Sequence, residues 1–68
     1  MKAFLDEFPV SDPGTTFTVE DIPTGAEELS VYAWDGLRKS IPLNGDSSIT
    51  IRDLTPGETY MFFVELPD

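Results

Sequence analysis

Residues 54 to 60 read Leu54-Thr55-Pro56-Gly57-Glu58-Thr59-Tyr60, and they carry the clearest structural signal in the chain. Pro56-Gly57 is typical of a tight turn, because proline presets φ at the first central position and glycine accepts a positive φ at the second. Tyr60 opens the following strand, where a buried ring needs a partner for its hydroxyl. We therefore expect a bend in which Leu54, Pro56, Gly57 and Tyr60 form a structural corner, with the Tyr60 hydroxyl bonded to backbone a few residues upstream.

Short apolar segments separated by turn residues extend from this corner towards both ends of the chain. Proline and glycine recur so often that no segment is long enough for a helix with caps at both ends, which favours a sandwich or barrel of short strands. Pro42 suits an edge strand, and Asn44-Gly45 predicts a hairpin turn between the segments on either side of it. The expected strands are residues 17–20, 29–34, 39–43, 48–52 and 59–66.

Alternation within two of these segments predicts which side chains are buried. In residues 59–66 the inward face carries Tyr60, Phe62 and Val64. Met61 and Phe63 then point outward, where either the N-terminal segment covers them or a partner docks on them. In residues 29–34, Leu29, Val31 and Ala33 share one face, and Ser30, Tyr32 and Trp34 share the other.

The corner and its neighbours resemble the fibronectin type III family, whose corner before the penultimate strand reads Leu-x-Pro-Gly-x-x-Tyr. Ile49-Thr50-Ile51 is similar to the family's fifth strand, Phe17-Thr18-Val19 to its first and Leu29-Ser30-Val31 to its second. The resemblance implies an all-β fold, namely a small antiparallel β-sandwich that is fibronectin type III-like or immunoglobulin-like. The chain has room for five or six strands instead of the family's usual seven.

Two departures from the family pattern bear on the surface. Trp34 lies one residue later than the family's tryptophan, so either a bulge turns it inward or it faces out. The chain also has no sequence for the family's last strand, which would leave residues 59–66 at an exposed edge. Either Lys2 to Phe8 folds back as a replacement strand, or a strand from another subunit pairs there. We accordingly divide the chain into an N-terminal arm or edge strand, residues 1–16, and a β-sandwich domain, residues 17–68.

The charge balance of 13 acidic against 4 basic residues, a formal −9, argues against two classes of partner. Such a surface repels nucleic acid and anionic membranes, so we expect it to bind neither. The same charge also keeps a small protein soluble. Asp6-Glu7 follows Leu5 without an apolar run, so we expect cytoplasmic synthesis without a signal peptide, with a virion as one final location.

The chemical inventory predicts a protein that is not an enzyme. There is no cysteine and no histidine, which removes thiol nucleophiles, histidine bases and the usual zinc ligands. Acidic residues come as adjacent pairs such as Glu27-Glu28, a poor geometry for an acid and a base that must face one substrate. We expect no catalytic residues, no cofactor and no metal.

These observations favour a non-catalytic interaction module. Small size, an incomplete sandwich and an apolar arm suggest a small structural or decorating (cement) subunit of a large assembly such as a bacteriophage virion, or a homo-oligomer. Two alternatives stay open: an acidic inhibitor of a basic nucleic-acid-binding enzyme, and an adhesion or carbohydrate-binding module of a multidomain protein. The expected partner-binding residues are large and apolar, namely Phe4, Leu5, Phe8, Tyr32, Trp34, Met61 and Phe63.

Overall fold

The computed structural model describes all 68 residues and contains six strands and no helix. This confirms the predicted all-β class with the larger of the two expected strand numbers. The strands are β1 (Lys2–Pro9), β2 (Phe17–Val19), β3 (Glu28–Ala33), β4 (Gly36–Pro42), β5 (Ile49–Ile51) and β6 (Thr59–Glu65).

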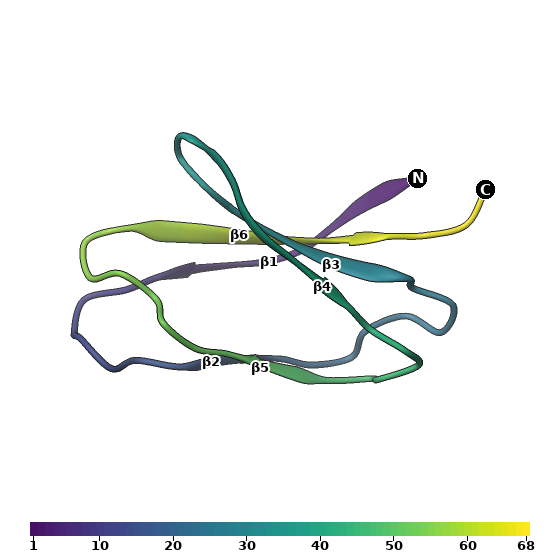
Figure 1. Cartoon of the computed structure of the whole chain (residues 1–68), viewed down its shortest axis with the longest axis horizontal. Coiled ribbons are helices and arrows are strands. Elements are labelled where there is room, and N and C mark those ends of the chain that lie inside the picture. The colour runs from purple at the N-terminus through teal and green to yellow at the C-terminus, as the bar shows by residue number, and fades with distance from the viewer.

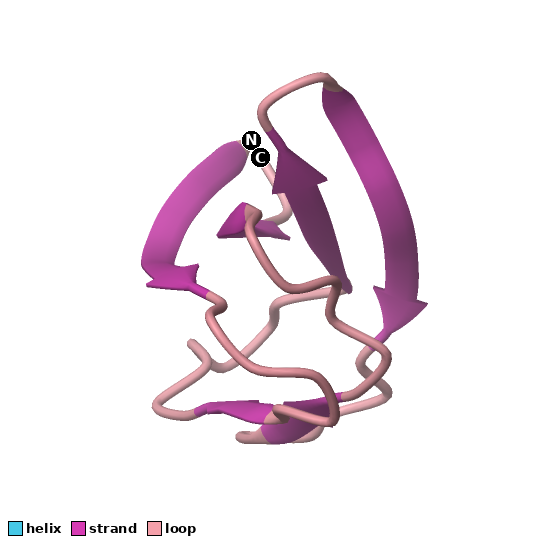
Figure 2. Cartoon of the chain, turned by 90° about the vertical axis from the view of Figure 1, so that its left-hand side faces the viewer, coloured by secondary structure: helices cyan, strands magenta, loops and turns pink.

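The strands form two antiparallel sheets. The larger sheet has the order β1-β6-β3-β4, and the smaller sheet pairs β2 with β5 (Figure 1). Figure 2 shows the larger sheet arched above the smaller one. This arrangement is that of a small sandwich, whose core is enclosed between the two layers.

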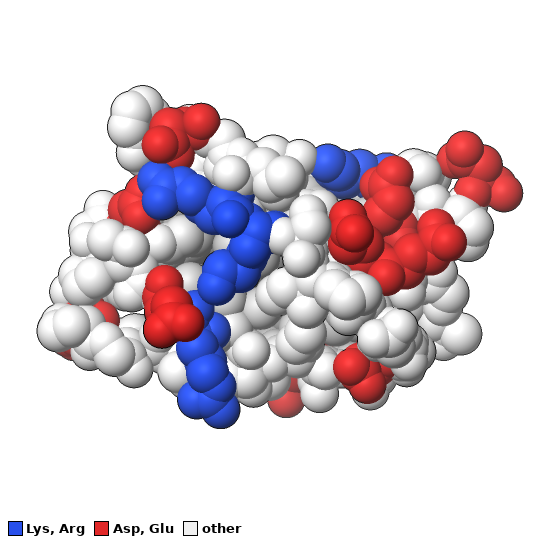
Figure 3. Space-filling model, in the orientation of Figure 1, with Lys and Arg blue, Asp and Glu red and all other residues white.

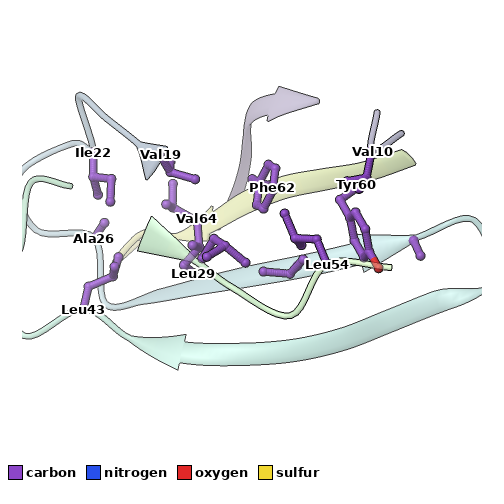
Figure 4. Close-up of a cluster of buried hydrophobic side chains, with 13 residues drawn as sticks. Val10, Val19, Ile22, Ala26, Leu29, Leu43, Leu54, Tyr60, Phe62 and Val64 are labelled. Atoms are coloured by element: carbon purple, nitrogen blue, oxygen red, sulfur yellow. The ribbon is translucent and has the colours of Figure 1, made fainter. Parts of the chain in front are cut away.

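The core is built from the inward faces that alternation predicted. Tyr60, Phe62 and Val64 of β6 are at most 4 % exposed, as are the three predicted residues of β3. Figure 4 shows side chains from several strands and loops meeting in one cluster. Phe17 of β2 stacks between Phe8 (ring centroids 4.4 Å apart) and Phe62 (5.2 Å), so aromatic packing ties the small sheet to the large one.

Strand β1 is the neighbour of β6, the strand that was predicted at residues 59–66. It pairs with β6 from Lys2 opposite Glu65 to Pro9 opposite Thr59, so the edge-strand alternative for the N-terminal segment is confirmed. β1 thus lies beside β6 in the place that the family resemblance assigns to the last strand. The chain covers the exposed edge of β6 with its own N-terminal segment.

A β-bulge explains the unusual apolar spacing of β1. The register with β6 passes from Phe4 opposite Phe63 to Asp6 opposite Phe62, so Leu5 is the extra residue. A bulge changes the phase of the alternation, which allows Leu5 and Phe8 to pack against the core although they are three residues apart. Phe4 remains on the outer face.

One sequence-based expectation about a connection is wrong. Asn44 and Gly45 do form a turn with positive φ values of 49° and 86°, closed by the Asp46 amide donating to the Leu43 carbonyl at 2.8 Å. The turn leads from one sheet to the other, however, and the hairpin partner of β4 is β3. Local backbone geometry forms the turn. The path of the chain after the turn follows from the burial of Leu43 before it and Ile51 after it, which fill the core from opposite layers.

The predicted corner is present. Tyr60 is 4 % exposed, and its hydroxyl accepts a hydrogen bond from the Thr55 amide (2.9 Å) and donates to Glu58 Oε2 (3.0 Å). Val10 holds the same turn from the other side, since its amide donates to the Glu58 carbonyl and its carbonyl accepts from the Gly57 amide. The loop after β1 is therefore tied to the corner.

Candidate functional site: the outer face of the large sheet

The most distinctive surface is the face of the large sheet that points away from the core. A continuous apolar row crosses it, formed by Phe4 of β1, Phe63 of β6, Tyr32 of β3 and Leu37 of β4. We call it the aromatic row. Phe63 meets Phe4 edge to face at 5.5 Å between centroids and meets Tyr32 in the same way at 5.4 Å. Leu37 lies opposite Tyr32 in the β3–β4 register.

The row is open to solvent along much of its length. Phe4 is 55 % exposed and Leu37 is 54 % exposed, while Tyr32, Phe63 and the adjoining Met61 are half-buried by one another. Edge-to-face contacts hold the rings in fixed orientations. The two sheets cover only the inner face, so this side of the large sheet presents ordered apolar side chains without a covering layer.

A cation lies beside the row. Lys2 Nζ donates to the Tyr32 hydroxyl at 2.6 Å and lies 4.9 Å from the centroid of that ring. The hydrogen bond that Lys2 donates to Tyr32, with attraction to Tyr32, Glu65 and Glu28, raises the pKa of Lys2 above the ordinary lysine value of 10.5. A cation near a tyrosine ring and its hydroxyl restrains both side chains.

The β3–β4 hairpin carries a second apolar feature at its tip. Trp34 is 83 % exposed, so it faces out instead of turning inward. The next residue, Asp35, accepts two hydrogen bonds from Arg38 (3.1 and 2.9 Å), and Arg38 also binds Glu58 at 2.6 Å. Because Glu58 in turn accepts from Tyr60, polar contacts connect the hairpin tip to the structural corner. The hydrogen bonds that Arg38 donates to Asp35 are the main cause that raises the pKa of Arg38.

The structure brings together some of the predicted partner-binding residues and separates others. Phe4, Tyr32, Met61 and Phe63 lie together on the outer face, and Trp34 is displayed at the hairpin tip. Leu5 and Phe8, in contrast, are partly buried against the core because of the bulge in β1, so they lie apart from the outer-face residues.

Two members of this face were missed by sequence reasoning. Leu37 precedes the predicted start of its strand, and Lys2 was considered only as part of the arm. Leu37 could have been found from a two-residue hairpin turn at Trp34-Asp35, because Ala33 then pairs with Gly36 and Leu37 lies opposite Tyr32.

Both open edges of the large sheet carry features that discourage further strand pairing. β1 has the bulge at Leu5, the exposed charges of Asp6 and Glu7, and Pro9 at its end. β4 has an extra residue at Arg38, the neighbouring Lys39, and Pro42. Bulges, charges and prolines are the devices by which edge strands avoid adding another strand. The free surface of this sheet is therefore its face.

Other surface features are less distinctive. Lys39 lies near Arg52, whose carbonyl accepts from Lys39 Nζ at 3.3 Å. Figure 3 shows Lys and Arg atoms forming a stripe on this side of the molecule. A hollow of about 90 Å³ lies between residues 22–26 and 45–47. No group of three or more carboxylates gathers as a metal site would require, and no helix long and apolar enough to cross a membrane is present.

Comparison with known proteins gives no relative from which a role could be transferred. No protein-family model matches the chain, and no curated protein or solved structure matches it. The features that bear on function are therefore those of the chain's own surface.

Proposed function

We propose that this chain is a non-catalytic protein-binding module that docks through the aromatic row. We further propose that its sandwich is a shortened fibronectin type III-like or immunoglobulin-like domain, in which β1 replaces the last strand. The position of β1 beside β6 and the Tyr60 corner support this reading. A small structural or decorating subunit of a larger assembly, such as a bacteriophage virion, is the form of the proposal to test first.

One observation carries the proposal: ordered aromatic side chains form a connected row on a sheet face that has no covering layer. Aromatic residues contribute much of the binding energy at protein interfaces, since they bury a large area with little loss of conformational freedom. Scattered exposed apolar residues need no explanation, but a connected and oriented set on one face is typical of an interaction site.

Site-specific photo-crosslinking tests the docking face. A photoreactive phenylalanine analogue replaces Leu37 or Phe4 on the row, or Thr18 on the far side of the small sheet, and the variants are expressed in the native cell. We expect the same crosslinked protein from Leu37 and Phe4 and none from Thr18. Cosedimentation of that product with a large particle supports the assembly role. Equal crosslinking from Thr18, or none from either row position, contradicts the docking face.

The net charge of −9 favours a second candidate, an acidic inhibitor that occupies a basic site on a nucleic-acid-binding protein. An inhibitor of this kind binds chiefly through carboxylates spread over the surface. Replacing Phe4 and Leu37 by serine would then leave the affinity unchanged, whereas adding salt would weaken it steeply. The aromatic-row proposal predicts the reverse ranking of these two perturbations.

A further inference from the structure

The shape of the aromatic row limits what can cover it. The row crosses all four strands of the sheet, and neighbouring strands are about 4.8 Å apart, so its length is about 14 Å. One apolar face of roughly ten helical residues, at about 1.5 Å of rise per residue, covers that length. The protected edges of β1 and β4 disfavour a partner that adds a strand.

The charged side chains beside the aromatic row indicate which charge a binding partner carries. On one side, Glu65 and Glu28 are in register with Lys2. On the other side, Glu7 lies opposite Met61. Carboxylates thus outnumber the ammonium group around the apolar centre, and the whole chain has the same sign of charge.

The two oxygens of the Glu65 carboxylate have different surroundings. Its Oε2 atom is shielded from water and has no hydrogen-bond donor, while Oε1 lies 3.9 Å from the N-terminal ammonium group. Because the Glu65 side chain is 44 % exposed, a cation of a partner can still approach the carboxylate. A second copy of this chain would bring further negative charge to the same place.

We infer that the occupant of the aromatic row is an apolar segment of another protein whose flanks carry lysine or arginine side chains. This inference rests on the proposed function, because it names the partner chemistry for the same face. The apolar centre supplies most of the affinity, and the basic flanks pair with Glu7, Glu28 and Glu65 and give orientation.

A pair of synthetic peptides tests the inference on the whole chain. Both have 14 residues and the same amphipathic pattern, one built from leucine and lysine and the other from leucine and glutamate. Binding is measured by calorimetry, and the contact surface is mapped by chemical-shift changes. We expect the Leu/Lys peptide to bind with a Kd of about 1–50 μM and the Leu/Glu peptide to show no binding.

Matched variants separate binding at the row from general attraction to an acidic protein. The double variant Phe4→Ser/Leu37→Ser keeps the net charge and changes two side chains that are more than half exposed, so the fold is retained. It should lose about tenfold or more in affinity. The control Thr18→Ser/Thr50→Ser, on the outer side of the small sheet, should bind like the parent chain. Raising the salt from about 50 to 500 mM should weaken binding about fivefold.

Several results would overturn the inference: no binding of the Leu/Lys peptide, equal binding by the double variant, or shift changes centred on Thr18 and Thr50. Self-association of the chain that grows with salt and is lost in the double variant would assign the row to a second copy instead. The photo-crosslinking experiment separates the two proposals. If Leu37 and Phe4 crosslink to a protein in the cell but the Leu/Lys peptide fails, the docking face stands and the partner chemistry is wrong.

Discussion

The Tyr60 hydroxyl is the polar group on which the bend after Pro56-Gly57 depends most. It accepts from the Thr55 amide and donates to Glu58, so a single oxygen satisfies one backbone donor and one carboxylate. Glu58 then extends the contact to Arg38 and thereby to the β3–β4 hairpin. Removing one atom at Tyr60 should therefore affect both the corner and the hairpin tip.

Tyr60→Phe is expected to lower the free energy of unfolding by about 1–2 kcal/mol, because the Thr55 amide and the Glu58 carboxylate each lose a partner in a partly buried place. Urea denaturation followed by far-ultraviolet circular dichroism measures the change. Tyr32→Phe is the matched control, since the hydroxyl it removes contacts only an exposed lysine, and it should cost less than about 0.5 kcal/mol. Equal losses in the two variants would refute the special role of the corner.

The contact between Lys2 and Tyr32 can be measured by titration. Hydrogen bonding to Tyr32 raises the pKa of Lys2, so this contribution to stability is complete below about pH 10.5 and is lost as the pH rises through the higher folded-state value. A carbon-detected NMR titration of the lysine side chains should give a midpoint for Lys2 above 10.5. Tyr32→Phe should move that midpoint back towards 10.5, and an unchanged midpoint would show that the contact is absent in solution.

Among the elements, β1 combines two roles on its opposite faces. Its inner face adds Leu5 and Phe8 to the core, and its outer face contributes Phe4 to the aromatic row. The bulge at Leu5 makes this division possible. Deleting the whole segment would destroy the core and the candidate site together, so single substitutions are the better probes.

Phe8→Ala should destabilise the chain by about 2–3 kcal/mol, because Phe8 stacks on Phe17 where the two sheets meet. Phe4→Ala lies on the same strand, but it changes a ring that is 55 % exposed, and it should cost less than about 1 kcal/mol. Chemical denaturation of both variants under the same conditions provides the comparison. A larger loss for Phe4 than for Phe8 would mean that the two faces of β1 are assigned the wrong way round.

The elements also show how far the sequence could predict this structure. Regular alternation identified the buried faces of β3 and β6, and turn chemistry identified the Pro56-Gly57 corner. The two β-bulges could not be recognised from the sequence. The extra residue at Arg38 interrupts the period of two in β4, so the predicted strand did not include Leu37. The extra residue at Leu5 turns Leu5 and Phe8 towards the core, which the sequence pattern did not indicate. The Asn44-Gly45 turn was correct locally, but only burial in the whole molecule selects the strand that pairs.

At the scale of the whole molecule, negative charge opposes compactness. A formal −9 on 68 residues concentrates like charges on a small surface, and the basic residues are gathered in part near β4. Repulsion of this kind is screened by salt. The same field disfavours self-association and favours approach to a basic partner, in agreement with the partner chemistry inferred for the aromatic row.

Added salt should consequently stabilise the folded chain. Between about 20 and 500 mM sodium chloride we expect the melting temperature to rise by several degrees, since about 1 kcal/mol corresponds to about 4–8 °C in a domain of this size. Calorimetry or circular dichroism measures the shift. Glu20→Lys, at an exposed position, reduces the net negative charge and should show a smaller rise. A melting temperature that falls with salt would contradict the role assigned to charge repulsion.

Strand β1 completes the large sheet within one chain, and this pairing both closes the edge of β6 and assembles the aromatic row. A nuclear Overhauser spectrum of the dilute monomer tests this most directly. We predict cross-strand contacts between Ala3 and Val64 and between the rings of Phe4 and Phe63, with intensities that do not change on dilution. If these contacts are missing, or appear only at concentrations where the chain associates, the sheet is not closed by its own N-terminal strand.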